Sequence, residues 1–263
     1  MTKHKLTVVA CVACLSLAAS ASALYFRQRG ECPADCKQPF SQILTWRQPQ
    51  PQTSTEQLRL HAQAITVKVK SKEFLGSGIL WRKQNSTYTV VTNAHVLRAG
   101  DAPYHIQTPD GRVYVATVPK NIKFGKNDLA ILQFRSTDKT YKVSSIGSQP
   151  MVGDEVFASG FYTELEAEKQ RFAFTTGKVS LLLPKALIGG YQIGYSNEIQ
   201  KGMSGGPLLN RRGEVVGVNG MQANPLWDAP STFIDGSQAN QALHEQINRL
   251  SWAVNTEKLV NLK

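Results

Sequence analysis

Three residues of the chain stand in separate local patterns that suit nucleophilic catalysis. His95 follows a β-branched run, Asp128 heads an apolar run, and Ser204 lies between glycines. They occur in the order His, Asp, Ser, separated by 33 and 76 positions. A serine hydroxyl is a weak nucleophile at neutral pH and needs a base within hydrogen-bond reach, which in turn needs an orienting carboxylate. The combination predicts Ser204 as nucleophile, His95 as its base and Asp128 as the group that orients His95.

The glycines around Ser204 predict a second element of the same chemistry. Gly202 and Gly205 let the backbone turn sharply and let a substrate approach closely. Such a loop can aim the amides of Gly202 and Ser204 at one point, where they would stabilise a developing oxyanion. Donors of this kind contribute about 2.7–4 kcal/mol each to catalysis in measured cases. We therefore expect Gly202 and Ser204 to form an oxyanion hole.

The same serine permits a rival interpretation. The segment 202–206 also matches Gly-x-Ser-x-Gly, and with Asp228 or Asp235 and then His244 it gives the Ser, Asp, His order of an α/β hydrolase. That fold needs a helix directly after the serine. The residues from Pro207 onward instead predict a hairpin, and alternating strands and helices are missing, so we expect this interpretation to fail.

Short strands are the elements that must position these residues. Ile65, Val67 and Val69 alternate with polar residues, which is the period of a half-buried strand. Two groups of about six such segments, separated by the polar stretch 135–142, predict two small barrels or sandwiches. The strand candidates are 65–69, 74–82, 87–92, 104–107, 112–118 and 129–134, then 155–161, 172–180, 191–195, 207–209, 214–218 and 251–254.

Helical patterns are few. Thr53 to Glu56 matches a capping box and predicts a short helix from there to about Ala64. Apolar residues at helical spacing predict a second helix at 238–249, and a last half-turn is expected at 256–260.

The N-terminus has the three-part design of a secretory signal. Residues 1–5 are basic, residues 6–19 are apolar, and residues 21–23 are small. We predict cleavage after Ala23 and export to the periplasm or the outside of the cell. An uncleaved membrane anchor is the alternative.

Composition narrows the class of protein but not its function. Apolar residues make up 41% and charged residues 19%, which excludes collagen, a long coiled coil and full disorder. A multi-span membrane protein is excluded because only one long apolar run occurs, near the N-terminus. The net charge is +11, and removal of the signal leaves 28 basic and 19 acidic residues, a charge of +9. The basic residues are scattered, so no nucleic acid partner is expected. Association with an anionic surface stays open.

The predicted mature chain keeps two cysteines. Cys32 and Cys36 lie in a Gln/Pro-rich tether over residues 24–60, and in an oxidising compartment they predict one small-loop disulfide. Two free thiols and an intermolecular link are the alternatives. A metal site would need further ligands, and no His or Cys lies close by, so no metal and no cofactor are expected.

Taken together, the motifs resemble those of the trypsin/chymotrypsin-like serine proteases, of the bacterial HtrA-like and cyanobacterial trypsin-like kind. The resemblance runs from about Ile65 to Val254. Its motifs are Gly76-Ser77-Gly78, Thr92-Asn93-Ala94-His95, Asp128-Leu129-Ala130-Ile131-Leu132 and Gly202-Met203-Ser204-Gly205-Gly206-Pro207.

This resemblance implies an all-β fold of two perpendicular six-stranded antiparallel barrels with a C-terminal helix and the His95, Asp128 and Ser204 triad in the cleft between them. His95 would act as base and then acid, Ser204 as nucleophile, and the amides of Gly202 and Ser204 as the oxyanion hole. We expect a signal at 1–23, a tether at 24–60 and a protease domain at 61–263, with one barrel at about 62–135 and the other at about 141–255.

Departures from the family pattern concern activation and neighbouring domains. Animal-type members carry an Asp directly before the serine that pairs with a newly cut N-terminus, whereas this chain has Met203. That form of activation is therefore not expected. No cysteine occurs beyond Cys36, so barrel disulfides are not expected, and neither are the PDZ modules of HtrA proteins.

Specificity residues follow from the resemblance alone. Glu198 lies six residues before Ser204, where trypsin carries its pocket acid, and a Glu198 that pointed into the pocket would favour Lys or Arg substrates. We prefer the alternative that Glu198 is a surface charge. By the family pattern, the pocket edge and the substrate-pairing segment would be Val218, Asn219, Gly220 and Met221, with Met221 narrowing the pocket.

Two functional hypotheses follow. The first is an exported serine endopeptidase that hydrolyses polypeptides through an acyl-enzyme. The second is a catalytically silent binding module on a protease fold at an anionic cell surface, because fold does not determine function.

Overall fold

The computed structural model describes residues 53–164, 169–224 and 231–260. The predicted signal, the tether up to residue 52, the Cys32 and Cys36 pair and Asp228 lie outside the described residues. No helix within the described ranges is both long and apolar enough to span a membrane.

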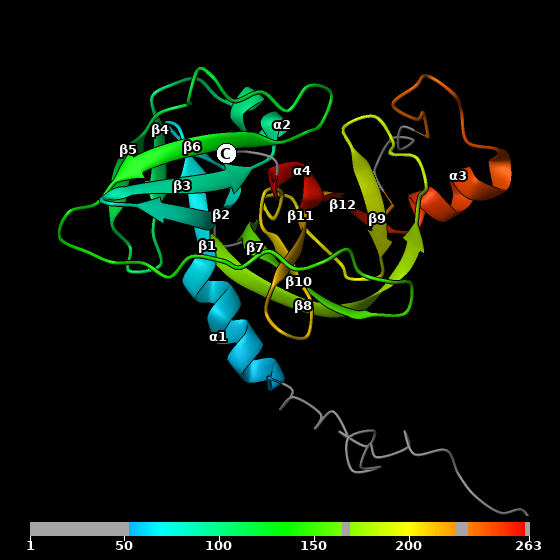
Figure 1. The fold of residues 1–263 in the computed structure, drawn as a ribbon, viewed down its shortest axis with the longest axis horizontal. Coiled ribbons are helices and arrows are strands. Elements are labelled where there is room, and N and C mark those ends of the chain that lie inside the picture. Colours follow the sequence, from blue (N-terminus) through cyan, green and yellow to red (C-terminus); the bar gives the residue numbers. More distant parts are fainter. Residues whose placement is uncertain (1–52, 165–168, 225–230, 261–263) are drawn as a thin grey trace, which may run out of the picture. The chain divides into compact units, whose positions relative to one another are not determined.

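Six of the strands form the first sheet, which lies on the left of Figure 1. Its order is β5-β4-β1-β2-β3-β6, and every described pairing is antiparallel. A bridge between Thr117, just after β5, and Gln133 of β6 joins its two edges. The strands are β1 (Thr66–Lys70), β2 (Phe74–Gln84), β3 (Thr87–Thr92), β4 (Tyr104–Gln107), β5 (Val113–Ala116) and β6 (Ala130–Arg135).

The other six described strands close into a barrel in the order β10-β11-β12-β9-β8-β7, again antiparallel. The prediction of two six-stranded antiparallel barrels is confirmed. The strands are β7 (Glu155–Glu164), β8 (Lys169–Leu182), β9 (Tyr191–Tyr195), β10 (Pro207–Leu209), β11 (Val215–Met221) and β12 (Ser251–Asn255).

The alternation that predicted the first strand reflects burial. Val67 and Val69 of β1 are fully buried, whereas Lys68 and Lys70 are partly exposed. Side chains of a strand point alternately to its two faces, so the valines fill the barrel and the lysines reach its outer side.

Helices are short and lie at the ends and edges of the sheets: α1 (Thr55–Ile65), α2 (Ala94–Arg98), α3 (Gln241–Asn248) and α4 (Glu257–Val260). The cap of α1 lies one residue later than predicted. Ser54 is the N-cap, its hydroxyl accepts from the Gln57 amide at 3.2 Å, and the Gln57 side chain accepts from the Ser54 amide at 3.0 Å. The C-terminal helices were predicted, whereas α2, which carries His95, was not.

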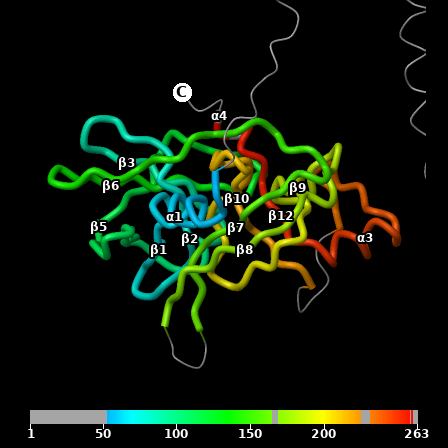
Figure 2. The backbone as a smooth tube through the Cα atoms, turned by 90° about the horizontal axis from the view of Figure 1, so that it is seen from below, coloured from blue at the N-terminus to red at the C-terminus, as the bar shows by residue number. Residues whose placement is uncertain are grey.

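Helix α1 leads directly into β1 and contacts both sheets. Leu58, Ala62 and Ile65 are fully buried at positions i, i+4 and i+7, which form one face of a helix. The helix packs against β2 of the first sheet and β8 of the barrel, both of which lie near it in Figure 2. The largest apolar cluster combines this face with residues of both barrels, among them Ile79 and Phe157. The helix therefore fixes the barrels to one another.

Candidate active site

Pairing of β3 with β6 brings His95 and Asp128 together. Thr92, the last residue of β3, lies opposite Ala130, the first of β6, so the chain leaving one strand lies beside the chain entering the other. Helix α2 begins at once and places the His95 amide 2.8 Å from Asp128 Oδ1 and the ring Nδ1 2.5 Å from Oδ2. The ring is thereby held in one orientation, and its Nε2 makes no hydrogen bond to any described residue.

Asp128 is surrounded by donors. Its side chain is 8% exposed, and the Arg98 guanidinium lies 3.5 Å from Oδ1. Burial alone would raise the pKa of Asp128, but the hydrogen bonds from His95 and Tyr191 and the charge of His95 outweigh it and lower the pKa. The carboxylate is therefore ionised at neutral pH, as an orienting group for His95 must be.

Tyr191 of β9 was not singled out from the sequence. Its hydroxyl donates to Asp128 Oδ2 at 2.5 Å, from the second barrel into the first. Burial and the Asp128 carboxylate raise the pKa of Tyr191 far above its ordinary value, so the phenol stays protonated and donates. The available signal was an aromatic residue directly after Gly189 and Gly190, a pair that is typical of a turn.

The loop around Ser204 turns sharply, as its glycines predict. The Met203 amide donates to the Gln200 carbonyl at 2.9 Å, and Gly202, the third residue of that turn, has φ +101°. A positive φ at this position is typical of a type II turn and favours glycine. Gly205 has φ +84°, and a Cβ there would lie 2.1 Å from the Ser77 carbonyl oxygen.

The Gly76-Ser77-Gly78 segment of β2 holds this loop from the first barrel. The Ser77 amide donates to the Ser204 carbonyl at 2.9 Å, and the Ser77 hydroxyl donates to the Gly202 carbonyl at 2.8 Å. A Cβ on Gly76 would lie only 3.2 Å from the Ser204 carbonyl oxygen and 2.9 Å from Val96. The motif therefore permits close contact between the strand, α2 and the serine loop.

The amides of the loop divide into two groups. Those of Met203, Gly205 and Gly206 donate within the protein, to carbonyls of Gln200, Asn219 and Met203 respectively. Those of Gly202 and Ser204 donate to no described residue. The two amides that the sequence predicts for an oxyanion hole are thus the ones that remain available to another acceptor. Met203 itself is fully buried.

The Ser204 hydroxyl donates to the Gly220 carbonyl at 3.3 Å. Within the described part of the chain no hydrogen bond joins it to His95. Contacts between a nucleophile and its base are often longer before a substrate is bound.

Residues predicted for specificity lie in different places. Glu198 is exposed and contributes to the lining of a cavity of about 350 Å³. The Val218 side chain is buried in the core, and the buried side chain of Asn219 donates through Nδ2 to the Ser159 carbonyl at 3.1 Å, so neither side chain lines this cavity. Its other lining residues are Ile199, Gln200, Lys201, Gln222, Ala223 and Asn224.

The described residues of the rival hydrolase interpretation, Asp235 and His244, do not contact Ser204. Asp235 is exposed and pairs with Lys185 at 2.6 Å, and His244 lies on α3 beside Asn248. The hairpin of β10 and β11, not a helix, follows the serine. The α/β-hydrolase interpretation is therefore wrong. Among the described residues, no group of three or more His, Cys, Asp and Glu side chains could hold a metal ion.

Comparison with known proteins gives one consistent result. Residues 76–218 match the family model described as "Trypsin-like peptidase domain". "Serine protease Do-like HtrA" of Bacillus subtilis is 29% identical over 153 residues, covering 56% of this chain and 33% of that protein. "Serine endoprotease DegS" of Haemophilus influenzae is 27% identical over 181 residues, covering 65% and 49%. "Probable periplasmic serine endoprotease DegP-like" of Chlamydia pneumoniae is 34% identical over 136 residues, covering 49% and 26%.

These matches span a quarter to a half of the relatives' own lengths. The family match covers more than half of this chain and includes His95, Asp128 and Ser204. The chain belongs to the trypsin-like peptidase domain family.

Proposed function

We propose that the protein is an exported serine endopeptidase that hydrolyses peptide bonds through an acyl-enzyme. The observation that carries this proposal is the double contact of His95 with Asp128, through its amide at 2.8 Å and its ring Nδ1 at 2.5 Å. It directs Nε2, which has no described partner, away from the carboxylate. A ring held in this way suits a general base for Ser204.

In the first half of the reaction, Ser204 Oγ attacks the carbonyl carbon of the substrate while His95 Nε2 takes the hydroxyl proton. The carbonyl oxygen becomes an oxyanion, which the amides of Gly202 and Ser204 stabilise. The C–N bond then breaks, and His95 returns the proton to the leaving amine. Asp128 remains ionised and stabilises the positively charged imidazole.

In the second half, a water molecule attacks the acyl carbon and gives a proton to His95. The ester bond to Ser204 breaks, the serine recovers its proton from His95, and the acid product leaves. Attack by Ser204 requires its hydroxyl to turn from the Gly220 carbonyl, its partner in this structure, toward His95.

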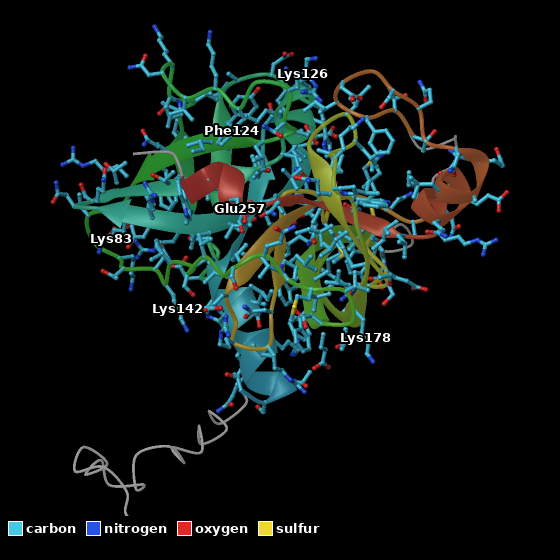
Figure 3. All side chains as sticks on the ribbon, turned by 45° about the vertical axis from the view of Figure 1, so that its right-hand side comes forward. Lys83, Phe124, Lys126, Lys142, Lys178 and Glu257 are labelled. Atoms are coloured by element: carbon cyan, nitrogen blue, oxygen red, sulfur yellow. The ribbon has the colours of Figure 1, made fainter. Side chains whose placement is uncertain are left out.

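Export is the second part of the proposal. The basic, apolar and small-residue segments of residues 1–23 support it, and so does a relative whose name includes "periplasmic". Polypeptides are the proposed substrates, and residues 61–263 form the proposed protease domain. The basic side chains Lys83, Lys126, Lys142 and Lys178 lie far apart on this domain (Figure 3).

Labelling with a fluorophosphonate tests the proposed nucleophile. Wild-type protein should be labelled at Ser204 and should cleave a denatured protein such as casein. Ser204→Ala should lose both labelling and cleavage while it stays folded by circular dichroism.

Ser180→Ala is a matched control, because Ser180 is an exposed serine on β8, and it should behave as wild type. Labelling that survives Ser204→Ala, or folded wild-type protein that is neither labelled nor active, contradicts the proposal. The second result would instead favour a silent binding module.

A further inference from the structure

Beyond the triad, the geometry around Asp128 points to a fourth side chain with a role in catalysis. We propose that Tyr191 is a positioning residue that holds the Asp128 carboxylate and sets the pH range in which His95 works as a base. This inference rests on the proposed function, because it assigns a role within the same site.

Two donors meet on a single oxygen of Asp128. Tyr191 Oη and His95 Nδ1 each lie 2.5 Å from Oδ2, while the His95 amide binds Oδ1 at 2.8 Å. The carboxylate is thus held by hydrogen bonds from two elements, from His95 of α2 and from Tyr191 of β9. Loss of the phenol would leave Oδ2 with His95 as its one hydrogen-bond partner among the described residues.

The fold makes room for this phenol at Gly220. A Cβ on Gly220 would lie 2.4 Å from Tyr191 Cε1 and 2.5 Å from its hydroxyl oxygen. Any side chain at this position would therefore push the tyrosine ring aside. Because the Gly220 carbonyl also accepts the Ser204 hydroxyl, the ring packs directly behind the backbone that contacts the nucleophile.

A tight turn fixes the tyrosine. The Gly190 amide donates to the Leu187 carbonyl at 2.8 Å, and the Leu187 amide donates to the Tyr191 carbonyl at 3.0 Å. The Asp128 amide donates to the Gly189 carbonyl at 2.7 Å. The turn therefore binds the backbone of Asp128, and Tyr191, which follows the turn, binds the Asp128 side chain. These two contacts join the barrels at the carboxylate.

The charged and titratable groups that face Asp128 are few. They are His95 and Arg98 from α2 and Tyr191 from β9, with Tyr195 close enough to influence Tyr191. The phenol directs the positive end of its O–H dipole at the oxygen that stabilises the protonated imidazole. It therefore weakens that stabilisation, and removing it should make protonated His95 more stable.

Substitution of Tyr191 by phenylalanine tests this prediction in the full-length enzyme. Tyr191→Phe should lower kcat/KM about tenfold at neutral pH, because Asp128 holds His95 less precisely and a larger share of His95 is protonated and cannot act as a base. The acid limb of its pH–rate profile should move to higher pH by about half a unit or more. Gly220→Ala should displace the ring and move the acid limb in the same direction.

Tyr195→Phe is the matched control for a merely structural role. Tyr195 lies on the same strand, is fully buried, and donates to Asn219 Oδ1 at 2.8 Å, not to Asp128. Loss of the Tyr195 hydroxyl should lower the free energy of unfolding but leave the acid limb of the pH–rate profile at the wild-type pH. Equal shifts in both variants, or no shift in Tyr191→Phe, would overturn the inference.

A second readout does not depend on turnover. NMR of the His95 ring in folded wild-type and Tyr191→Phe protein should show its titration midpoint moving to higher pH in the variant. If the wild-type enzyme cleaves no peptide, the proposed function fails, and this titration still decides the role of Tyr191. If the enzyme is active and the midpoint does not move, the role of Tyr191 fails alone.

Discussion

The Ser77 hydroxyl on β2 donates to the Gly202 carbonyl at 2.8 Å and so ties the first barrel to the loop that carries Ser204. The same oxygen accepts from the Phe161 amide of β7 at 2.7 Å. Ser77 is fully buried, so water does not replace either partner. One side chain thus limits how the Gly202 turn can move, and with it the amide proposed for the oxyanion hole.

Ser77→Ala should therefore lower both stability and activity. The unpaired Phe161 amide and Gly202 carbonyl should reduce the free energy of unfolding by about 1–3 kcal/mol, and kcat/KM should fall about tenfold as the turn loosens. Urea unfolding and peptide hydrolysis measure the two effects. Ser159→Ala is the control, because the hydroxyl of this buried serine makes only one long contact among the described residues, with Thr66 at 3.5 Å. A similar loss of kcat/KM in both variants would contradict a specific role for Ser77.

Asp128→Asn should reduce kcat by about four orders of magnitude while the fold is kept. An amide has one acceptor and one donor end, so it cannot accept from both the ring and the backbone of His95 as the carboxylate does, and the ring adopts the wrong tautomer. Steady-state kinetics and thermal unfolding measure the outcome. Asp154→Asn, an exposed acid that accepts from the Met151 amide, should keep wild-type kcat. Activity of Asp128→Asn within tenfold of wild type would contradict the assigned role.

Local patterns in the sequence predicted most of the fold because its elements are short and half-buried. Alternation located β1 within one residue, since Val67 and Val69 must face the barrel interior. The capping residue of α1 was misplaced by one position because both Thr53 and Ser54 are good caps. The burial of Leu58 is compatible with either residue as N-cap. The contact of the Gln57 side chain with Ser54 identifies Ser54 as the cap.

Contacts between distant segments could not be predicted in this way. Tyr191 and Gly220 belong to neighbouring parts of the site only because β9 and β11 both pair with β12. The family pattern assigns Val218 and Asn219 to the pocket edge and the substrate-pairing segment. Both side chains are buried, so a contact with substrate would come from their backbone, and that assignment stays a prediction.

Helix α1 should contribute strongly to stability although it lies outside both sheets. Leu58 is fully buried in the cluster that joins the barrels, so Leu58→Ala should lower the free energy of unfolding by about 2–5 kcal/mol. Leu60→Ala is the control in the same helix, because Leu60 is 55% exposed, and it should change stability by less than about 0.5 kcal/mol. Chemical denaturation measures both. Equal effects would mean that α1 is not packed as described.

Glu198 should have little influence on substrate choice. It is exposed, and Lys201 lines the same cavity with the opposite charge. Glu198→Gln should therefore change kcat/KM for substrates with Lys or Arg before the cut by less than about threefold, the effect of a weak, solvent-screened charge. A library of fluorogenic peptides that vary at this position measures the ratio. A selective loss of more than tenfold for basic substrates would show that Glu198 is a pocket acid after all.

His61 should make stability depend on pH. It lies on α1, its Nε2 donates to the Gly213 carbonyl at 2.9 Å, and its Nδ1 is buried with no hydrogen-bond partner among the described residues. Burial, followed by the charge of Lys142, lowers the pKa of His61, although the hydrogen bond to Gly213 opposes this. Lys142 lies beside α1 (Figure 3).

The sign of the effect follows from proton binding. As the pH falls through about 6.5, the ordinary pKa of histidine, His61 of the unfolded chain takes up a proton before the folded protein does, and the free energy of unfolding decreases. His61→Gln keeps an N–H donor for Gly213 but cannot titrate, so its stability should fall less than that of wild type between about pH 7 and pH 5. Lys142→Gln should make stability depend less steeply on pH than in wild type, because it removes one of the two effects that lower the pKa of His61. Urea unfolding at half-unit pH steps measures the three slopes. Parallel curves for wild type and His61→Gln would show that His61 titrates alike in the folded and unfolded chain.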